Sequence, residues 1–182
     1  MNTLTTLALV AAGIAQIGCA GIGHQSMPFS QASLPSAVQV PAGNRVSMEA
    51  AAAGDISYEC RAKRDMPGQF EWAFVGPDAG MRDRQGKVIG KYYGPPATWE
   101  AMDGSRVTGT QVTVAPAGVA DIPLQLVKAN PIMGAGAMQG TSYIQRVNTR
   151  GGVAPPMACG ASNAGQKTLV KYSADYIFWR AG

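Results

Sequence analysis

The chain has 182 residues, of which 15 are basic and 11 acidic, so its formal net charge is +4. It contains three cysteines and one histidine, His24, which lies close to the N-terminus. A domain folded from the remaining residues offers no Ser-His-Asp or Cys-His arrangement and no histidine-based zinc or copper site. We therefore expect no metal and no cofactor.

Residues 1–20 resemble an export signal. The uncharged apolar stretch from Leu4 to Gly18 holds about 15 residues, too few to span a bilayer but suited to the central region of a signal peptide. Small residues at Gly18 and Ala20 allow cleavage after Ala20, whereas Ile17-Gly18-Cys19 resembles a bacterial lipobox in which Cys19 is lipidated. We expect an exported protein of the periplasm or cell envelope, either soluble or anchored to the membrane through Cys19.

Residues 21–36 are rich in Gly, Ser, Gln and Pro and contain no charged side chain, a composition typical of a flexible tether. Residues 37–182 are long enough to bury the core of one domain. All basic residues lie from Arg45 onward and are spread along this domain. Nucleic-acid binding would need a denser basic stripe, so we expect no nucleic-acid partner.

The domain is predicted to be all-β. Runs of alternating apolar and polar residues, divided by Gly and Pro, indicate about eight to ten short strands. A sandwich is preferred and a barrel is the alternative. Asp103-Gly104 predicts a hairpin turn. The expected strands cover residues 45–50, 56–61, 70–75, 106–114, 124–128, 142–149, 168–172 and 175–180.

Cys60 and Cys159 are the two cysteines of the expected domain. In an oxidising compartment such a pair usually forms a disulfide, and we expect one structural bridge between them. The pair lacks the CxxC spacing of redox-active cysteines.

Several separate motifs resemble one family of exported domains. They are the runs 90–109 and 141–155, Tyr58-Glu59-Cys60, Trp72 to Pro77, Cys159 and Tyr172 to Phe178. Together, in their order along the chain, they resemble the secreted domain of unknown function 3455 of bacteria and fungi, over about residues 35–182. The resemblance implies an exported β-rich domain without an established activity. Some fungal relatives carry a malate dehydrogenase label, which this sequence does not support because it has no nucleotide-binding loop and no histidine in the domain.

The chain departs from the family pattern at one motif. Relatives tend to read His-Tyr before the Gly-Pro-Thr-Trp-Glu run, whereas this chain has Tyr92-Tyr93 and an additional residue at Pro96-Ala97. A family function that depends on that histidine is not expected here.

The strand around Arg146 contains the candidate binding residues. Alternation sends Ile144 and Arg146 to one face and Tyr143, Gln145 and Val147 to the other. A buried guanidinium needs a partner, and Glu100 is the predicted one. This pair is either structural or part of a pocket for a polar small molecule or glycan. The predicted ligand-binding residues are Trp99, Glu100, Gln145 and Arg146.

Catalysis is the less favoured alternative. Glu100 and Asp103 flank the predicted hairpin beside Trp99. Two nearby carboxylates next to aromatic rings could hydrolyse an envelope or extracellular glycan. An Asp in an Asp-Gly turn is, however, explained by backbone geometry alone. We therefore expect a non-catalytic binding or structural domain.

Overall fold

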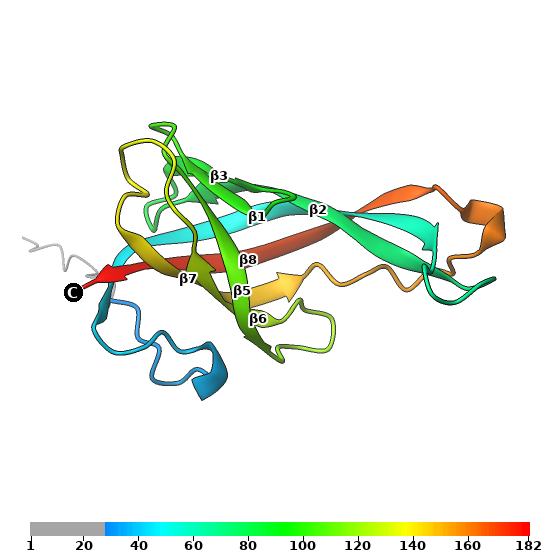
Figure 1. Cartoon of the computed structure of the whole chain (residues 1–182), viewed down its shortest axis with the longest axis horizontal. Coiled ribbons are helices and arrows are strands. Elements are labelled where there is room, and N and C mark those ends of the chain that lie inside the picture. The colour runs from blue at the N-terminus through cyan, green and yellow to red at the C-terminus, as the bar shows by residue number, and fades with distance from the viewer. Residues whose placement is uncertain (1–27) are drawn as a thin grey trace, which may run out of the picture.

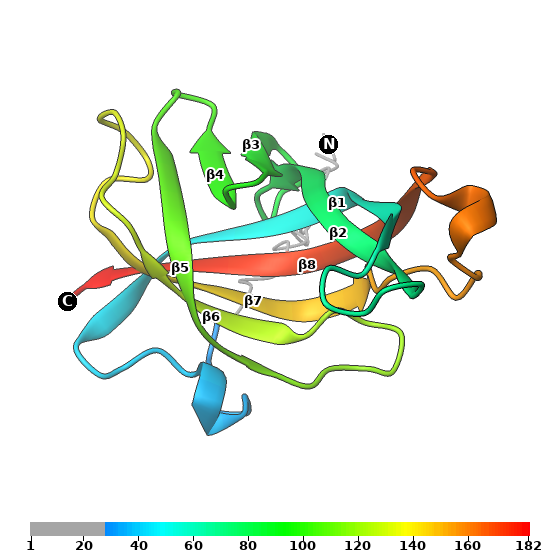
Figure 2. The same ribbon diagram turned by 45° about the vertical axis from the view of Figure 1, so that its right-hand side comes forward.

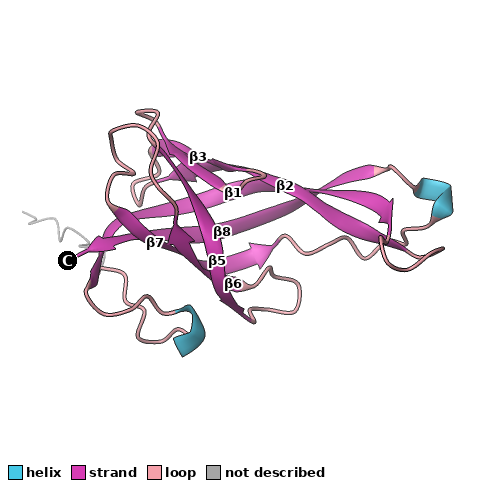
Figure 3. Ribbon diagram, viewed as in Figure 1, coloured by secondary structure: helices cyan, strands magenta, loops and turns pink. Residues whose placement is uncertain are grey.

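The computed structural model of the protein describes residues 28–182, which form eight antiparallel strands and two short 3-10 helices (Figure 1, Figure 3). The strands are β1 (Asn44–Ala62), β2 (Phe70–Arg82), β3 (Val88–Tyr93), β4 (Thr98–Ala101), β5 (Arg106–Ala115), β6 (Leu124–Ala129), β7 (Thr141–Gly151) and β8 (Lys167–Ala181). The helices are η1 (Ser36–Val38) and η2 (Ala161–Asn163). The prediction of an all-β fold is confirmed. No helix within residues 28–182 is long and apolar enough to cross a membrane.

The strands form a single closed sheet. Each strand pairs with its neighbours in the sequence, and β1 also pairs with β8. The hydrogen-bonded order is that of a closed barrel, β1 to β8. The sequence favoured a sandwich, with a barrel as the alternative. In the structure, hydrogen bonds join all eight strands into one continuous sheet.

Two strands are longer than the sequence predicts. β1 joins the expected segments 45–50 and 56–61, and β8 joins 168–172 and 175–180. Gly54 lies between the two expected segments, and glycine commonly marks a turn. In the structure, a Cβ atom on Gly54 would lie 2.1 Å from the carbonyl oxygen of Asp78 in β2. Glycine at this position therefore permits close approach of two paired strands.

The distal parts of β1, β2 and β8 extend beyond the other strands as an arm, defined by residues 56–62, 70–76 and 167–171 (Figure 1). The connection between β7 and β8 runs alongside this arm and contains η2. Cys60 in β1 forms a disulfide with Cys159 in this connection, with 5.5 Å between the Cα atoms. The predicted disulfide is confirmed, and it fastens the connection to the arm.

The inward-facing side chains form the main core. It is rich in aromatic rings, because the even-numbered residues of β8 from Tyr172 to Phe178 all point inward. Tyr92 of β3 and Trp99 of β4 pack against them. Tyr92 and Trp99 also line the pocket described below.

A second core lies on the outer face, under residues 28–40, which we call the strap. Val38 and Val40 are buried against β5 to β8, and the ring of Phe29 packs edge-on against Trp179 with 6.3 Å between centroids. Helix η1 lies next to β5 and β6 (Figure 2). Residues 28–36 of the expected tether thus contact the domain. The predicted signal region, residues 1–20, and Cys19 lie outside the described residues.

Candidate functional site

Arg146 lies on the inner face of β7, as the alternation of the sequence predicts. Its neighbour Ile144 belongs to the main core, whereas Val147 belongs to the core under the strap, and Tyr143 packs against that outer core. Cross-strand pairing places Arg146 between Tyr176 of β8 and Gln125 of β6. Residues directly opposite one another share a face of the sheet, so these three side chains point the same way.

A pocket of about 320 Å³ opens beside Arg146 and is lined by residues from β2 to β7. Its rings come from Phe74, Tyr92 and Trp99, and its polar groups from Gln111, Gln125 and Arg146. Ala97, Gly109 and Val127 complete the lining. Trp99 and Arg146, two of the four residues predicted to bind a ligand, therefore do share a pocket.

Trp99 forms the innermost part of this lining and is only 1% exposed. Tyr92 lies directly opposite it in the β3–β4 pair, and the two rings stack with 4.8 Å between centroids. The edge of Tyr176 approaches from β8 at 5.5 Å. The indole N–H of Trp99 is buried and has no hydrogen-bond partner among the described residues. A buried donor without a partner costs free energy, and this one lies in the wall of a pocket.

Tyrosine hydroxyls surround the same region. Burial raises the pKa of Tyr92, Tyr172 and Tyr176, and the positive charge of Arg146 opposes this rise in each case. The hydroxyls of Tyr172 and Tyr176 are buried and have no hydrogen-bond partner of good geometry among the described residues. Tyr58 differs because its hydroxyl donates to the carbonyl oxygen of Gly152 at 2.8 Å. The interior near Arg146 is thus lined with protonated phenols.

The predicted ion pair between Arg146 and Glu100 is wrong. Arg146 donates from Nε and Nη2 to the carbonyl oxygen of Pro123, at 3.1 and 3.0 Å. Glu100 accepts a hydrogen bond from the hydroxyl of Tyr93 at 2.8 Å and lies 3.6 Å from Nζ of Lys91. Glu100 follows the inward-facing Trp99 in β4 and therefore points to the outer face of the sheet, whereas Arg146 points inward, so the two side chains do not meet. Arg146 forms no ion pair within residues 28–182.

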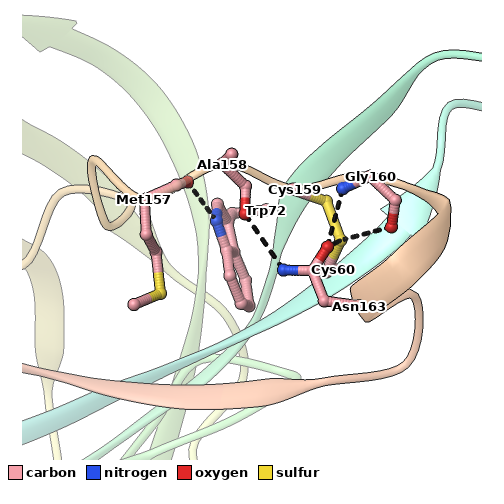
Figure 4. Close-up of a disulfide and its surroundings, with 7 residues drawn as sticks. All are labelled: Cys60, Trp72, Met157, Ala158, Cys159, Gly160 and Asn163. Carbon is pink, nitrogen blue, oxygen red and sulfur yellow. Dashed lines mark hydrogen bonds between the residues drawn. A yellow bond between two sulfur atoms is a disulfide. The ribbon is translucent and has the colours of Figure 1, made fainter.

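Side chains around the disulfide reinforce the attachment of the β7–β8 connection (Figure 4). The indole N–H of Trp72 donates to the carbonyl oxygen of Met157 at 2.8 Å. The side chain of Asn163 donates to the carbonyl oxygen of Ala158 at 3.0 Å and accepts from the backbone N–H of Gly160 at 2.8 Å. These hydrogen bonds, together with the disulfide, hold the β7–β8 connection in place against the arm.

A family model described as "Protein of unknown function (DUF3455)" matches residues 41–180. The chain belongs to this family. No curated protein and no solved structure matches the chain. The lining of the pocket and both cysteines of the disulfide lie within the matched span of the DUF3455 domain, whereas the strap precedes it.

Gln145 of the DUF3455 domain is buried on the opposite face of β7 from Arg146, where it connects the strap to the sheet. Its Nε2 donates to the carbonyl oxygen of Val38 at 2.6 Å and to Oε1 of Gln31 at 3.0 Å. Its Oε1 accepts a hydrogen bond from the indole N–H of Trp179 at 2.8 Å. The structure therefore places Gln145 in a buried polar network and away from the pocket.

Glu100 and Asp103 also lie outside the pocket lining. The hydrogen bond from Tyr93 and the charge of Lys91 hold the pKa of Glu100 below its ordinary value. Asp103 accepts hydrogen bonds from the hydroxyl and the backbone N–H of Ser105 and from the backbone N–H of Ala137, and these lower its pKa. A glycosidase needs one carboxyl group that stays protonated as the acid. The environment of both residues favours the opposite, ionised state.

Phe74, Gln111 and Gln125 also line the pocket but were not predicted from the sequence. Gln125 could have been found only from the register, which pairs it with Arg146. Phe74 lies opposite Tyr58 in the β1–β2 pair, just beyond a bulge at Ser57 and Tyr58 that nothing in the alternation predicts.

Proposed function

We propose that this DUF3455 domain is a non-catalytic binding domain whose pocket, between Trp99 and Arg146, takes a small polar molecule. The observation that carries the proposal is the shared pocket itself. It combines apolar rings with a few polar groups from different strands, which is the usual composition of a small-molecule site.

The energetics of the lining support this proposal. The indole N–H of Trp99, which belongs to the lining, is buried and lacks a partner among the described residues. A buried polar group without a hydrogen bond costs about 1–3 kcal/mol. A ligand that accepts this hydrogen bond would recover part of that free energy, whereas a purely structural core gains nothing from an unpartnered donor.

A screen of small molecules against the full chain tests the proposed function. We expect at least one sugar, organic acid or amine to raise the melting temperature by about 5–10 °C at a hundredfold excess over its Kd. Ala97→Phe should abolish this shift because the larger side chain grows from the pocket wall. Val112→Phe adds a ring to an exposed position of the same protein and serves as the matched control.

Two results would contradict the proposed function. The first is a screen without any saturable shift in melting temperature. The second is a shift that Ala97→Phe leaves unchanged, since the ligand would then bind elsewhere. A two-dimensional NMR spectrum of each variant confirms that it is folded before its binding is compared.

We further propose that the protein works outside the cytoplasm, in the periplasm or cell envelope or as a secreted protein. The apolar leader and the disulfide between Cys60 and Cys159 support this location, because stable disulfides form mainly in oxidising compartments. Attachment to the membrane through a lipid on Cys19 and a soluble form cut after Ala20 are the two proposed states of the mature chain.

The intact mass of the protein isolated from its native host distinguishes these states. A mature chain that starts at Cys19 and carries acyl groups would show the lipid-anchored form. A chain that starts at Gly21 would show the soluble form. In both cases we expect the mass to be lower by two hydrogen atoms than that of the dithiol, because Cys60 and Cys159 are bonded. A full-length chain with free thiols would contradict export.

A further inference from the structure

We infer that the ligand of the pocket is a small organic acid whose carboxylate pairs with Arg146. This inference rests on the proposed binding function and adds the chemical class of the ligand. Four observations carry it: the charge of the lining, the free edge of the guanidinium, the buried hydrogen-bond donors and the size of the pocket.

The lining of the pocket has an unbalanced positive charge. Arg146 is its one charged residue, and no Asp or Glu belongs to the lining. Asp78, whose negative charge helps to raise the pKa of the neighbouring Tyr172, is exposed and lies outside the lining. Asp121, on the β5–β6 connection, lies 3.8 Å from Arg150 and accepts a hydrogen bond from Gly151. An anion in the pocket would supply the missing counter-charge for Arg146.

The guanidinium of Arg146 is held in a way that leaves one edge free. Both Nε and Nη2 donate to the same carbonyl oxygen, that of Pro123. The Nη1 atom has no partner within residues 28–182, and Nη2 keeps a second proton. Because the guanidinium is planar, these protons form a second fork that fits the two oxygens of a carboxylate. The carbonyl of Pro123 therefore fixes the group in place without using its recognition edge.

The interior beside Arg146 is rich in donors. The indole N–H of Trp99 can only donate, and it has no acceptor among the described residues. The hydroxyls of Tyr92, Tyr172 and Tyr176 contact one another beside the pocket, and burial keeps these phenols protonated. Gln125 donates from Nε2 to Oε1 of Gln111 at 2.6 Å, which leaves the amide N–H groups of Gln111 as further donors. Donors around a cation favour a ligand that accepts hydrogen bonds and carries negative charge.

The size of the pocket favours a small ring-bearing acid. Its volume of about 320 Å³ lies at the lower end of the roughly 300–1,000 Å³ found for small-molecule sites. Phe74 lines the pocket while its side chain is 55% exposed, so its ring is available for stacking with a ligand. The ring of Tyr58 packs against it edge-on, with 6.1 Å between centroids, and holds it in position. Benzoate therefore serves as the probe, and benzamide as its neutral isostere.

Isothermal titration of the full chain with benzoate, benzamide and inorganic phosphate tests the inference. We expect benzoate to bind at least about tenfold more tightly than benzamide, and Arg146→Gln to weaken benzoate binding by about tenfold or more. Arg146→Lys should retain part of the affinity, because it keeps the charge and loses the fork. Arg150→Gln is the matched control. Arg150 also lies on β7 and donates to a backbone carbonyl, but it is not part of the pocket, so this variant should bind benzoate like the parent.

The outcomes separate this inference from the proposed function. Equal binding of benzoate and benzamide, with no effect of Arg146→Gln, would overturn the anionic ligand and leave a neutral-ligand site intact. Binding of phosphate without benzoate would overturn the organic acid. Absence of benzoate binding at millimolar concentration would also overturn it, while the broader screen with Ala97→Phe judges the proposed function separately. If Arg146→Gln fails to fold, the comparison of Arg146→Lys with Arg150→Gln decides.

Discussion

Replacing Cys60 and Cys159 together by alanine lowers the free energy of unfolding by about 4–5 kcal/mol, because the bridge closes a loop of about 100 residues. The cysteines are separated by 99 positions in the sequence. The disulfide removes conformational freedom mainly from the unfolded chain, and a long loop has much freedom to lose. Since a domain is typically stable by about 5–15 kcal/mol, we expect the variant to be only marginally folded.

Urea denaturation of the parent and of the double variant measures this loss. Reductant should destabilise the parent to a similar extent and leave the variant unchanged. Trp72→Phe provides a comparison, because it removes one hydrogen bond to the same connection and should cost only about 1 kcal/mol. A loss of less than about 1 kcal/mol in the double variant would contradict the structural role of the disulfide.

Trp99→Ala lowers the free energy of unfolding by about 3–5 kcal/mol, the range found for buried aromatic residues truncated to alanine. Trp99 is 1% exposed and packs against Tyr92, Tyr176 and Phe178. Removing the indole would leave a cavity at the junction of the main core and the pocket. Trp99→Phe should cost less, because the indole N–H has no hydrogen bond to lose.

Met102→Ala is the control for this prediction. Met102 lies three positions along the chain from Trp99 but is 71% exposed, so its removal should change stability by no more than about 0.5 kcal/mol. Chemical denaturation of the three variants gives the ranking. If Trp99→Ala were as mild as Met102→Ala, the indole would not be part of a packed core.

The sequence predicts the fold class and the disulfide because both depend on local or countable features. Alternating residues predict most of the strands, and a pair of cysteines in a domain expected to be exported predicts the bridge between Cys60 and Cys159. Strand β3 was missed, because Gly90 interrupts its pattern. A Cβ atom on Gly90 would lie 2.1 Å from the carbonyl oxygen of Glu100, so this glycine, like Gly54, allows close packing inside a strand.

The candidate site was predictable only in part. Alternation correctly placed Arg146 on the same face as Ile144, and Trp99 and Arg146 do share a pocket. The predicted partner Glu100 follows the inward-facing Trp99 and so lies on the outer face of β4, and the short segment around it does not show which of its faces is buried. The environment of Gln145 depends on the strap. Residues 21–36 have the composition of a tether, yet Phe29 and Val38 of the strap pack on the sheet. Long-range packing of this kind leaves no local signal in the sequence.

The most direct test of the pocket as a ligand site is an NMR measurement on isotope-labelled full-length protein with bound benzoate. We predict nuclear Overhauser contacts between the benzoate ring protons and the side chains of Phe74 and Tyr92, together with a shift of the Trp99 indole N–H and the Arg146 Nε–H signals. Contacts confined to the outer face, or saturable binding without any change at Trp99 and Arg146, would contradict the account.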